Sequence, residues 1–201
     1  MTIDIVLELK GHTLLLASHS PRRRELLEGL GVPFRVVSVE ADETYPASLT
    51  AGEIPLYIAR AKARAYEERL QDKELLLTAD TIVWCDNEML GKPKDEEDAR
   101  KMLRQLSGKT HQVYTAVCLT WRADGEIRCE EFVDTTDVTF RDLTDEEIDY
   151  YVETFRPLDK AGAYGIQEWI GYIGVTGIKG CYFNVMGLPL QPLYAALTQV
   201  I

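Results

Sequence analysis

The sequence predicts an α/β protein with a mixed sheet flanked by helices, and three observations lead to this class. The nearly continuous apolar run at residues 75–84 is typical of a central strand covered on both faces. Helical and strand patterns alternate along the chain. Asp124-Gly125, a dipeptide favoured in tight turns, joins two long strand patterns into an expected antiparallel hairpin. Parallel and antiparallel strands are therefore expected in one sheet.

Local signals place the elements of the N-terminal half. Ser20 is a typical N-cap residue, and Pro21 fits the first position of a helix that follows a short apolar strand. From Glu53 onwards, apolar residues recur at helical spacing. The expected elements are a strand at 14–17, a helix from 21, a strand at 34–39, an acidic loop at 40–44, a helix from 53 to about 70, the central strand at 75–84 and a turn at 88–93.

The C-terminal half carries further helix signals. Residues 96–106 place apolar side chains at i, i+3, i+4 and i+7, and Gly108 ends this helix. Thr144 and Glu147 have the spacing of a capping box, so a helix begins there and extends to about residue 155. The other expected elements are strands at 112–121 and 127–140, a loop of small and polar residues at 159–167 and a last helix from about 188.

Composition limits the classes of protein and partner. With 201 residues, of which 46% are hydrophobic, the chain can bury a substantial core, and we expect a single domain over residues 1–201. The net charge of -11 argues against long nucleic acids and anionic membranes as partners but is compatible with a small phosphorylated ligand. Because the chain has neither a signal-peptide pattern nor an apolar run of membrane-spanning length, we expect a cytoplasmic protein.

The cysteines and histidines do not suggest a zinc site. Cys85, Cys118, Cys129 and Cys181 are widely spaced, and the first three lie in strand patterns, so they are expected to be reduced core thiols. The three histidines are too scattered to form a ligand set. Any metal is therefore expected to be a hard cation bound by carboxylates and phosphate.

An arginine cluster, residues 22–24, occupies the first turn of the first predicted helix. Cations there cost a few tenths of a kcal/mol each, because helix N-termini carry partial positive charge. Backbone N–H groups, the hydroxyls of Ser18 and Ser20 and guanidinium groups all suit phosphate oxygens, so a bound polyanion is predicted. The alternative is a solvated patch facing Glu25 and Glu28.

Asp80 is the strongest candidate for chemistry, since an ionisable group inside a buried strand needs partners or a function. The alternative is an aspartate that caps the following turn. The acidic loop with Glu40, Asp42 and Glu43 could hold magnesium, although such loops are commonly just solvated. Possible phosphate contacts are Lys62, Lys92 and Lys160, although single lysines are usually surface charges. Lys92 is the best candidate of the three, because it lies in a constrained turn.

These parts suit hydrolysis of a phosphoanhydride by water. A P-loop and a dinucleotide-binding G-x-G-x-x-G are both absent from the sequence. The common phosphate loops of kinases and dehydrogenases are therefore not available.

The chain resembles the Maf family of nucleotide pyrophosphatases in several short motifs that follow one another in order. They are Ser18-x-Ser20-Pro21-Arg22-Arg23-x-Glu25-Leu26-Leu27, Ala79-Asp80-Thr81, Gly91-Lys92-Pro93, Leu106-Ser107-Gly108, the segment 159–167 and Gly187-Leu188-Pro189. The resemblance implies a fold like that of inosine triphosphate pyrophosphatases, with an elongated mixed sheet and two lobes around a cleft. It also implies cleavage of a nucleoside triphosphate to monophosphate and pyrophosphate.

Three positions are similar to the family's dTTP/UTP subgroup, namely Arg22, Thr81 and Gln167. The subgroup that acts on 7-methyl-GTP carries other residues there, so this alternative is disfavoured. Glu168 departs from the family pattern, in which glycine often follows the glutamine. It could alter the base pocket.

The resemblance also implies a role for each candidate residue. Asp80 would accept the proton of the attacking water, and Glu43 and Asp80 would bind Mg²⁺ or Mn²⁺. Lys92 would be the third catalytic residue. The substrate-binding residues would be Ser18, Ser20, Arg22, Arg23, Lys62, Thr81, Lys160 and Gln167, with Arg22, Thr81 and Gln167 setting specificity.

A different class of function stays open at this point. The family's association with septum formation suggests a nucleotide-binding regulator of cell division that binds ligand without turnover. Because a sensor needs no water-activating base, Asp80 favours the enzyme. The partners expected are a nucleoside triphosphate and a second copy of the chain in a homodimer.

Overall fold

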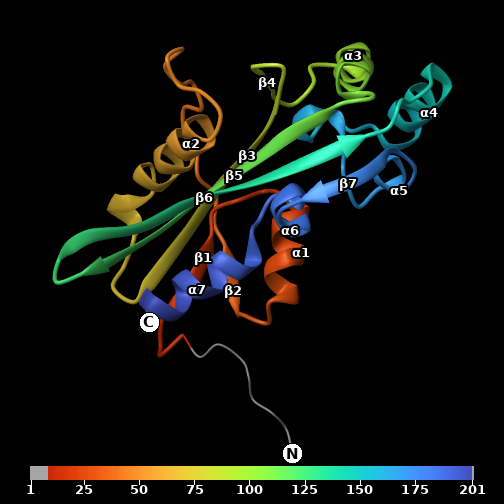
Figure 1. Cartoon of the computed structure of the whole chain (residues 1–201). Coiled ribbons are helices and arrows are strands. Elements are labelled where there is room, and N and C mark those ends of the chain that lie inside the picture. The colour runs from red at the N-terminus through yellow and green to blue at the C-terminus, as the bar shows by residue number, and fades with distance from the viewer. Residues whose placement is uncertain (1–8, 201) are drawn as a thin grey trace, which may run out of the picture. The chain divides into compact units, whose positions relative to one another are not determined.

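The computed structural model of the protein describes residues 9–200 and contains a seven-stranded mixed sheet (Figure 1). The strand order is β2-β1-β3-β5-β6-β7, and β4 pairs with β3. The strands are β1 (Thr13–Leu16), β2 (Phe34–Val36), β3 (Glu74–Cys85), β4 (Glu88–Leu90), β5 (Thr110–Ala123), β6 (Glu126–Phe140) and β7 (Val175–Lys179). Strand β1 is parallel to β2 and β3, whereas β4 is antiparallel to β3 and β7 to β6. The predicted α/β class with a mixed sheet is confirmed.

The helices are interspersed with these strands along the chain. They are α1 (Pro21–Gly29), α2 (Glu53–Arg64), α3 (Glu96–Leu106), α4 (Asp145–Phe155), α5 (Trp169–Gly174), α6 (Tyr182–Met186) and α7 (Leu190–Val200), with short 3₁₀ turns η1 (Glu67–Arg69) and η2 (Ala161–Ala163). None of the helices described is long and apolar enough to span a membrane.

The chain divides into two compact units. Unit 1 comprises the described residues up to Asp80, residues 116–133 and the described residues from Gly187 onwards. Unit 2 comprises residues 81–115 and 134–186. Three of the boundaries between the units fall within β3, β5 and β6, and the fourth follows α6. The assignment of residues 1–201 to a single domain stays a prediction.

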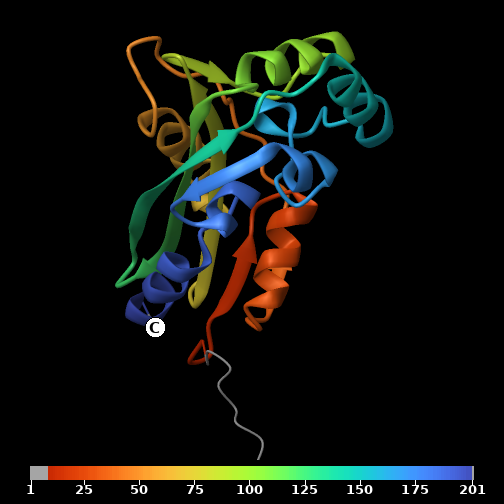
Figure 2. The same cartoon turned by 45° about the vertical axis from the view of Figure 1, so that its right-hand side comes forward.

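The core of unit 1 is formed by β1, β3 and β5 with α2. Leu15 and Leu76 from the strands pack with Ala59 and Ala63 of α2 in one buried cluster. Alanine lets this helix approach the sheet closely, because it adds little side-chain volume. Leu14 and Leu16 are also buried, and they point to the opposite face. Helix α1 lies on that other side of β1 (Figures 1 and 2).

Two predicted helix starts are confirmed by their caps. The Ser20 side chain accepts a hydrogen bond from the Arg23 N–H, and Pro21 opens α1. Thr144 and Glu147 form the reciprocal bonds of a capping box at the start of α4. The last helix begins two residues later than expected, at Leu190. Local capping chemistry was therefore sufficient to place these helices.

Two predicted elements are shorter than expected. Strand β2 ends at Val36 rather than at residue 39, because its partner β1 ends at Leu16 and the last bond between them runs from Val37 N to Leu16 O, 3.0 Å. Helix α2 ends at Arg64, and the 3₁₀ turn η1 replaces the predicted continuation to about residue 70.

Several elements were not predicted. The segment 88–93, expected to be a turn, contains strand β4, and the turn lies earlier at Asp86-Asn87. Both turn residues have positive φ, 51° and 62°, as a tight hairpin requires. Elements α5, β7 and α6 were not predicted from the sequence either.

The expectation that the cysteines are core thiols is correct for only two of the four. Cys85 and Cys118 are buried, Cys181 is half-buried and Cys129 is exposed. The strand positions of Cys85, Cys118 and Cys129 are confirmed.

Candidate active site

The turn between β1 and α1 is built by its two serines. The Ser20 N–H donates to Ser18 Oγ at 3.2 Å, and Ser20 Oγ accepts from Arg23 N at 3.4 Å. These bonds hold the backbone at the start of α1, where unpaired N–H groups and the helix dipole favour an anion. The turn thus has the form expected of a phosphate-binding segment.

Arg23 is held by main-chain and side-chain acceptors within unit 1. Its Nε donates to Gly187 O at 2.8 Å, and one terminal nitrogen lies 3.5 Å from Ser18 Oγ. Burial lowers the pKa of Arg23, with Asp80 and Glu43 acting in the opposite direction. The guanidinium therefore lies within electrostatic range of both predicted carboxylates.

Asp80 and Glu43 bind the same ammonium group. Lys62 Nζ, from α2, lies 2.8 Å from Asp80 Oδ1 and 3.0 Å from Glu43 Oε1. The side chains of Lys62 and Asp80 are each 15% exposed, whereas that of Glu43, in the loop before α2, is 55% exposed. Unit 1 thus brings together a base, a second carboxylate and a cation that the sequence separates by 18 and 19 residues.

The fold explains why Asp80 can ionise within a central strand. Residues 75–79 of β3 are buried, whereas Asp80 and Thr81 are only half-buried. The strand is thus interrupted by two polar positions between buried stretches. The first of them is paired with Lys62, which offsets the desolvation of its carboxylate.

The donor chemistry at this place fits a hard divalent cation. Two carboxylates already bond one cation, and Mg²⁺ is commonly bound by one or two carboxylates together with substrate phosphates and water. Within residues 9–200, groups of three or more possible metal-ligating side chains occur only on β5 and β6. Glu43 and Asp80 would therefore need phosphate oxygens to complete the coordination of Mg²⁺ or Mn²⁺.

Thr81 begins a polar chain within unit 2. Its Oγ1 lies 2.9 Å from Thr115 Oγ1, which donates to Asn184 O at 3.0 Å. Asn184 in turn donates to Val113 O and to Thr136 Oγ1. These bonds fix the Thr81 side chain in position.

Lys160 lies in a buried network of charged and polar groups in unit 2. Its side chain is 9% exposed, and Nζ contacts Asp159 Oδ1 at 2.7 Å and Glu168 Oε1 at 3.2 Å. The other oxygen of Glu168 accepts from the Tyr151 hydroxyl, which also accepts from Gly165 N at 3.0 Å. Burial, followed by the bond to Glu168, raises the pKa of Tyr151. Glu168, which departs from the family pattern, is therefore a structural partner of Lys160.

Gln167 lies in the loop that this network holds. Its amide oxygen is buried and has no hydrogen-bond partner among the residues described. The loop continues into α5, where Gly171 contacts the Ile166 backbone so closely that a Cβ at position 171 would overlap the Ile166 carbonyl. Tyr172 donates to Gln167 O at 2.7 Å. The backbone of the loop is thus held in place, while the buried amide oxygen of Gln167 lacks a partner among the described residues.

Lys92 is in a different situation from the other predicted lysines. Its side chain is exposed, and in the part of the chain that the structure describes it makes no ion pair. The neighbouring Gly91 O accepts from Gly162 N at 3.0 Å, which fixes the turn to η2. The cation of Lys92 is available to an anionic ligand.

Two residues that hold site side chains in place, Tyr151 for the loop and Asn184 for the Thr81 chain, were not predicted from the sequence. Tyr151 lies on the apolar face of α4 with Ile148 and Val152, so its spacing indicated an ordinary core aromatic. Asn184 belongs to α6, which was not predicted. A buried tyrosine hydroxyl needs a partner, but the sequence does not indicate which one.

Comparisons with known proteins agree on one family. The model of the family described as Maf-like protein matches residues 13–200. A protein of Phocaeicola vulgatus named dTTP/UTP pyrophosphatase is 57% identical over 193 residues, which cover 96% of this chain and 98% of that protein. Relatives with the same name are 51% identical in Porphyromonas gingivalis, over 94% of each chain, and 45% identical in Flavobacterium johnsoniae, over 96% of this chain and 98% of the relative.

Similarity to solved structures is much weaker. The Ham1 protein of Staphylococcus aureus matches with a TM-score of 0.46 and 13% identity over 64% of this chain and 71% of that one. A similarity of this size supports no conclusion. The family match and the relatives extend over nearly the whole chain, and on this basis the chain belongs to the Maf family.

Proposed function

We propose that this protein hydrolyses dTTP and UTP to the nucleoside monophosphate and pyrophosphate. The observation that carries the proposal is the shared ion pair of Asp80 and Glu43 with Lys62, within electrostatic range of Arg23. The names of the relatives supply the substrate pair. Carboxylates and cations together are what hydrolysis of a phosphoanhydride requires.

In the proposed step, a water oxygen attacks the α-phosphorus and the bond from this phosphorus to the bridging oxygen breaks. Pyrophosphate leaves with the bridging oxygen, and Asp80 accepts the proton of the water. Ser18 and Ser20 with the α1 N-terminus, together with Arg22 and Arg23, would bind phosphate oxygens. Their role is to hold the chain of phosphates while negative charge moves onto the leaving group.

Glu43 and Asp80 would hold a Mg²⁺ or Mn²⁺ ion, which, when bound, neutralises charge on the triphosphate. Lys62 currently bonds both carboxylates. If such an ion took those oxygens, the ammonium of Lys62 would be free to bind phosphate. Lys92 and Lys160 are proposed as further phosphate or substrate contacts.

Base selection is proposed for Gln167, Thr81 and Arg22. The buried amide oxygen of Gln167 lacks a partner among the described residues, and it could accept from the N3–H of uracil or thymine. The amide nitrogen could donate to a neighbouring carbonyl oxygen of the base. A site that pairs these groups rejects bases that cannot complete the bonds.

The test is pyrophosphate release from UTP, dTTP, CTP, ATP, GTP and 7-methyl-GTP, with Mg²⁺ and with Mn²⁺. Turnover of UTP and dTTP that is lost in Asp80→Asn would support the proposal. Tight binding without release would instead favour the nucleotide-binding regulator, and preference for 7-methyl-GTP would favour the sister subgroup.

Assembly and location belong to the same proposal. We propose a homodimer in the cytoplasm. Light scattering coupled to size-exclusion chromatography would show twice the chain mass of 22.8 kDa for a homodimer.

A further inference from the structure

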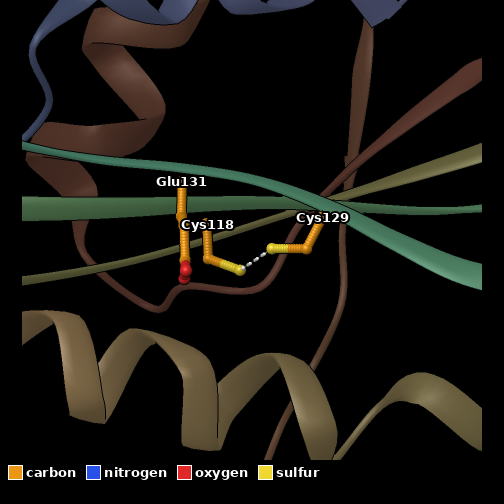
Figure 3. Close-up of side chains that lie close together, drawn as sticks. All are labelled: Cys118, Cys129 and Glu131. Atoms are coloured by element: carbon orange, nitrogen blue, oxygen red, sulfur yellow. Dashed lines mark hydrogen bonds between the residues drawn. The ribbon is translucent and has the colours of Figure 1, made fainter.

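Two of the four cysteines lie side by side on neighbouring strands of unit 1. Cys118 is on β5 and Cys129 is on β6, and their Sγ atoms are 2.8 Å apart. Figure 3 shows the two sulfur atoms pointing toward each other. A disulfide bond is about 2.05 Å long, so bond formation requires the atoms to approach by about 0.8 Å.

The two thiols differ in their access to solvent. Cys118 is 1% exposed, whereas Cys129 is exposed at the protein surface. Thr120 Oγ1 lies 3.4 Å from the Cys118 sulfur and donates to the Cys129 sulfur at 3.8 Å. A small oxidant in solution therefore meets Cys129 first.

The hydrogen bond between the thiols also distinguishes their acidity. The bond from Cys118 lowers the pKa of Cys129. The same bond, with burial as the next cause, raises the pKa of Cys118. Because the thiolate is the reactive form of cysteine, this asymmetry makes Cys129 the more reactive of the two.

We propose that Cys118 and Cys129 form an oxidisable dithiol, a modification site that takes a hydroperoxide as its oxidant. The Cys129 thiolate attacks one peroxide oxygen, which forms an S–O bond and breaks the O–O bond. The departing alkoxide or hydroxide takes a proton. The result is a sulfenic acid on Cys129 and one molecule of alcohol or water.

The second step joins the two cysteines. The Cys118 sulfur attacks the Cys129 sulfur, the S–S bond forms and the S–O bond breaks. The hydroxide leaves with the proton of Cys118 as water. Overall, two thiols are oxidised to one disulfide while the peroxide takes up two electrons.

The alternative occupant of this place is a metal ion. Cys118, Cys129 and Glu131 offer ligand atoms within 4.8 Å of one another, a set that suits zinc. However, both oxygens of Glu131 are bound by Arg60 of α2, one of them by Nε at 2.6 Å. Since this carboxylate is already paired, the observations favour chemistry between the two sulfurs.

The test uses the full chain, without any substitution, exposed to one equivalent of hydrogen peroxide. Remaining thiols are alkylated, and the protein is digested with trypsin without reduction. Cleavage after Lys109, Arg122, Arg128 and Arg141 places Cys118 in peptide 110–122 and Cys129 in peptide 129–141. We expect these two peptides to be joined, with a mass 2 Da below their sum, and to separate after reduction.

Other products would overturn the proposal. These are Cys129 converted to sulfinic acid while Cys118 remains a free thiol, or disulfides formed only between chains. Stoichiometric zinc in the isolated protein that is lost in Cys129→Ser would equally contradict it and would assign the site to the metal.

Variants test the order of the steps. Cys118→Ala should leave a sulfenic acid on Cys129 that dimedone traps, and Cys129→Ser should slow the oxidation of Cys118 by roughly tenfold or more. Cys181→Ser, which alters a half-buried thiol elsewhere, should leave the cross-link unchanged. Dimedone labelling of Cys118 rather than Cys129 would overturn the order. If Cys118→Ala does not fold, the peptide map of the unaltered chain still decides.

Discussion

The charged groups of unit 1 and those of unit 2 are held in different ways. In unit 1, Asp80 and Glu43 share the ammonium of Lys62, and Glu43 is more than half exposed. In unit 2, Lys160 and Glu168 are largely buried, and Glu168 is bonded on its second oxygen by Tyr151. The first arrangement leaves room for a substrate or a metal to replace a partner. The second holds a loop in place through buried bonds.

We expect the largest effect when the carboxylate of Asp80, the proposed base in unit 1, is removed, and the quantity affected is turnover. Asp80→Asn keeps the size of the side chain but cannot accept the proton of water, so kcat should fall by about 10²–10⁴-fold. Pyrophosphate release from UTP measures this. Asp86→Asn, which also removes a carboxylate paired with a lysine, is the matched control and should retain activity. Equal losses in both variants would contradict the assigned role of Asp80.

Removing one hydroxyl from the buried network should lower the free energy of unfolding rather than the rate of hydrolysis. Tyr151→Phe leaves Gly165 N–H and one oxygen of Glu168 without their partner, at an expected cost of about 1–3 kcal/mol in the free energy of unfolding. Urea denaturation measures it. Tyr150→Phe at the adjacent, 50% exposed position is the control and should change stability little. If both variants behave alike, the network does not hold the loop.

Unit 2 should also make folding sensitive to acid. Burial lowers the pKa of His111 from 6.5 to about 4. Between these values the unfolded chain binds the proton and the folded chain does not, so stability falls as pH decreases through this range. At pH 5, protonation of His111 in the unfolded chain should lower the free energy of unfolding by about 2 kcal/mol relative to neutral pH.

The measurement for His111 is the free energy of unfolding at pH 7 and at pH 5. His111→Phe should reduce the difference between the two values, whereas His19→Gln, at an exposed position, should not. An undiminished difference in His111→Phe would assign the acid sensitivity to other groups.

The smallest expected effect concerns Gln167, whose buried amide oxygen has no partner among the described residues. Gln167→Glu retains an acceptor but loses the amide donor, so kcat/KM for UTP should fall by about tenfold, equivalent to one hydrogen bond. Steady-state kinetics with UTP and dTTP measure it. Gln191→Glu, at an exposed position of α7, is the control and should leave both values near those of the unaltered protein. An unchanged preference in Gln167→Glu would remove Gln167 from the proposed specificity set.

Sequence patterns predicted the parts of the fold whose signals are local. The caps at Ser20 and Thr144 and the apolar run of β3 each depend on neighbouring residues only. Strand β4 was missed because its signal is the backbone conformation of Asp86 and Asn87, and this dipeptide is not the usual hairpin turn. Strand β7 is short and contains a glycine, which weakens any strand pattern.

The same difference between local and long-range signals applies to the candidate site. Residue types and motifs pointed to Asp80 and Lys62 separately, but their 2.8 Å contact depends on the packing of α2 against β3. The support of Gln167 by Tyr151 depends on pairing between α4 and a loop, and a tyrosine among apolar residues gives no indication of it. The proximity of Cys118 and Cys129 follows from the packing of side chains on adjacent strands, which the hairpin prediction alone did not specify.

The close contact of Gly171 with the Ile166 carbonyl limits how this protein can diversify. Any other residue at that position would displace the backbone that leads to Gln167. Gly29, by contrast, has open space around its Cα and could be exchanged freely. In a saturation library selected for nucleotide hydrolysis, we therefore expect only glycine at position 171 and many different residues at position 29. Variation in substrate range then has to arise through changes of side chains rather than through a new backbone path of this loop.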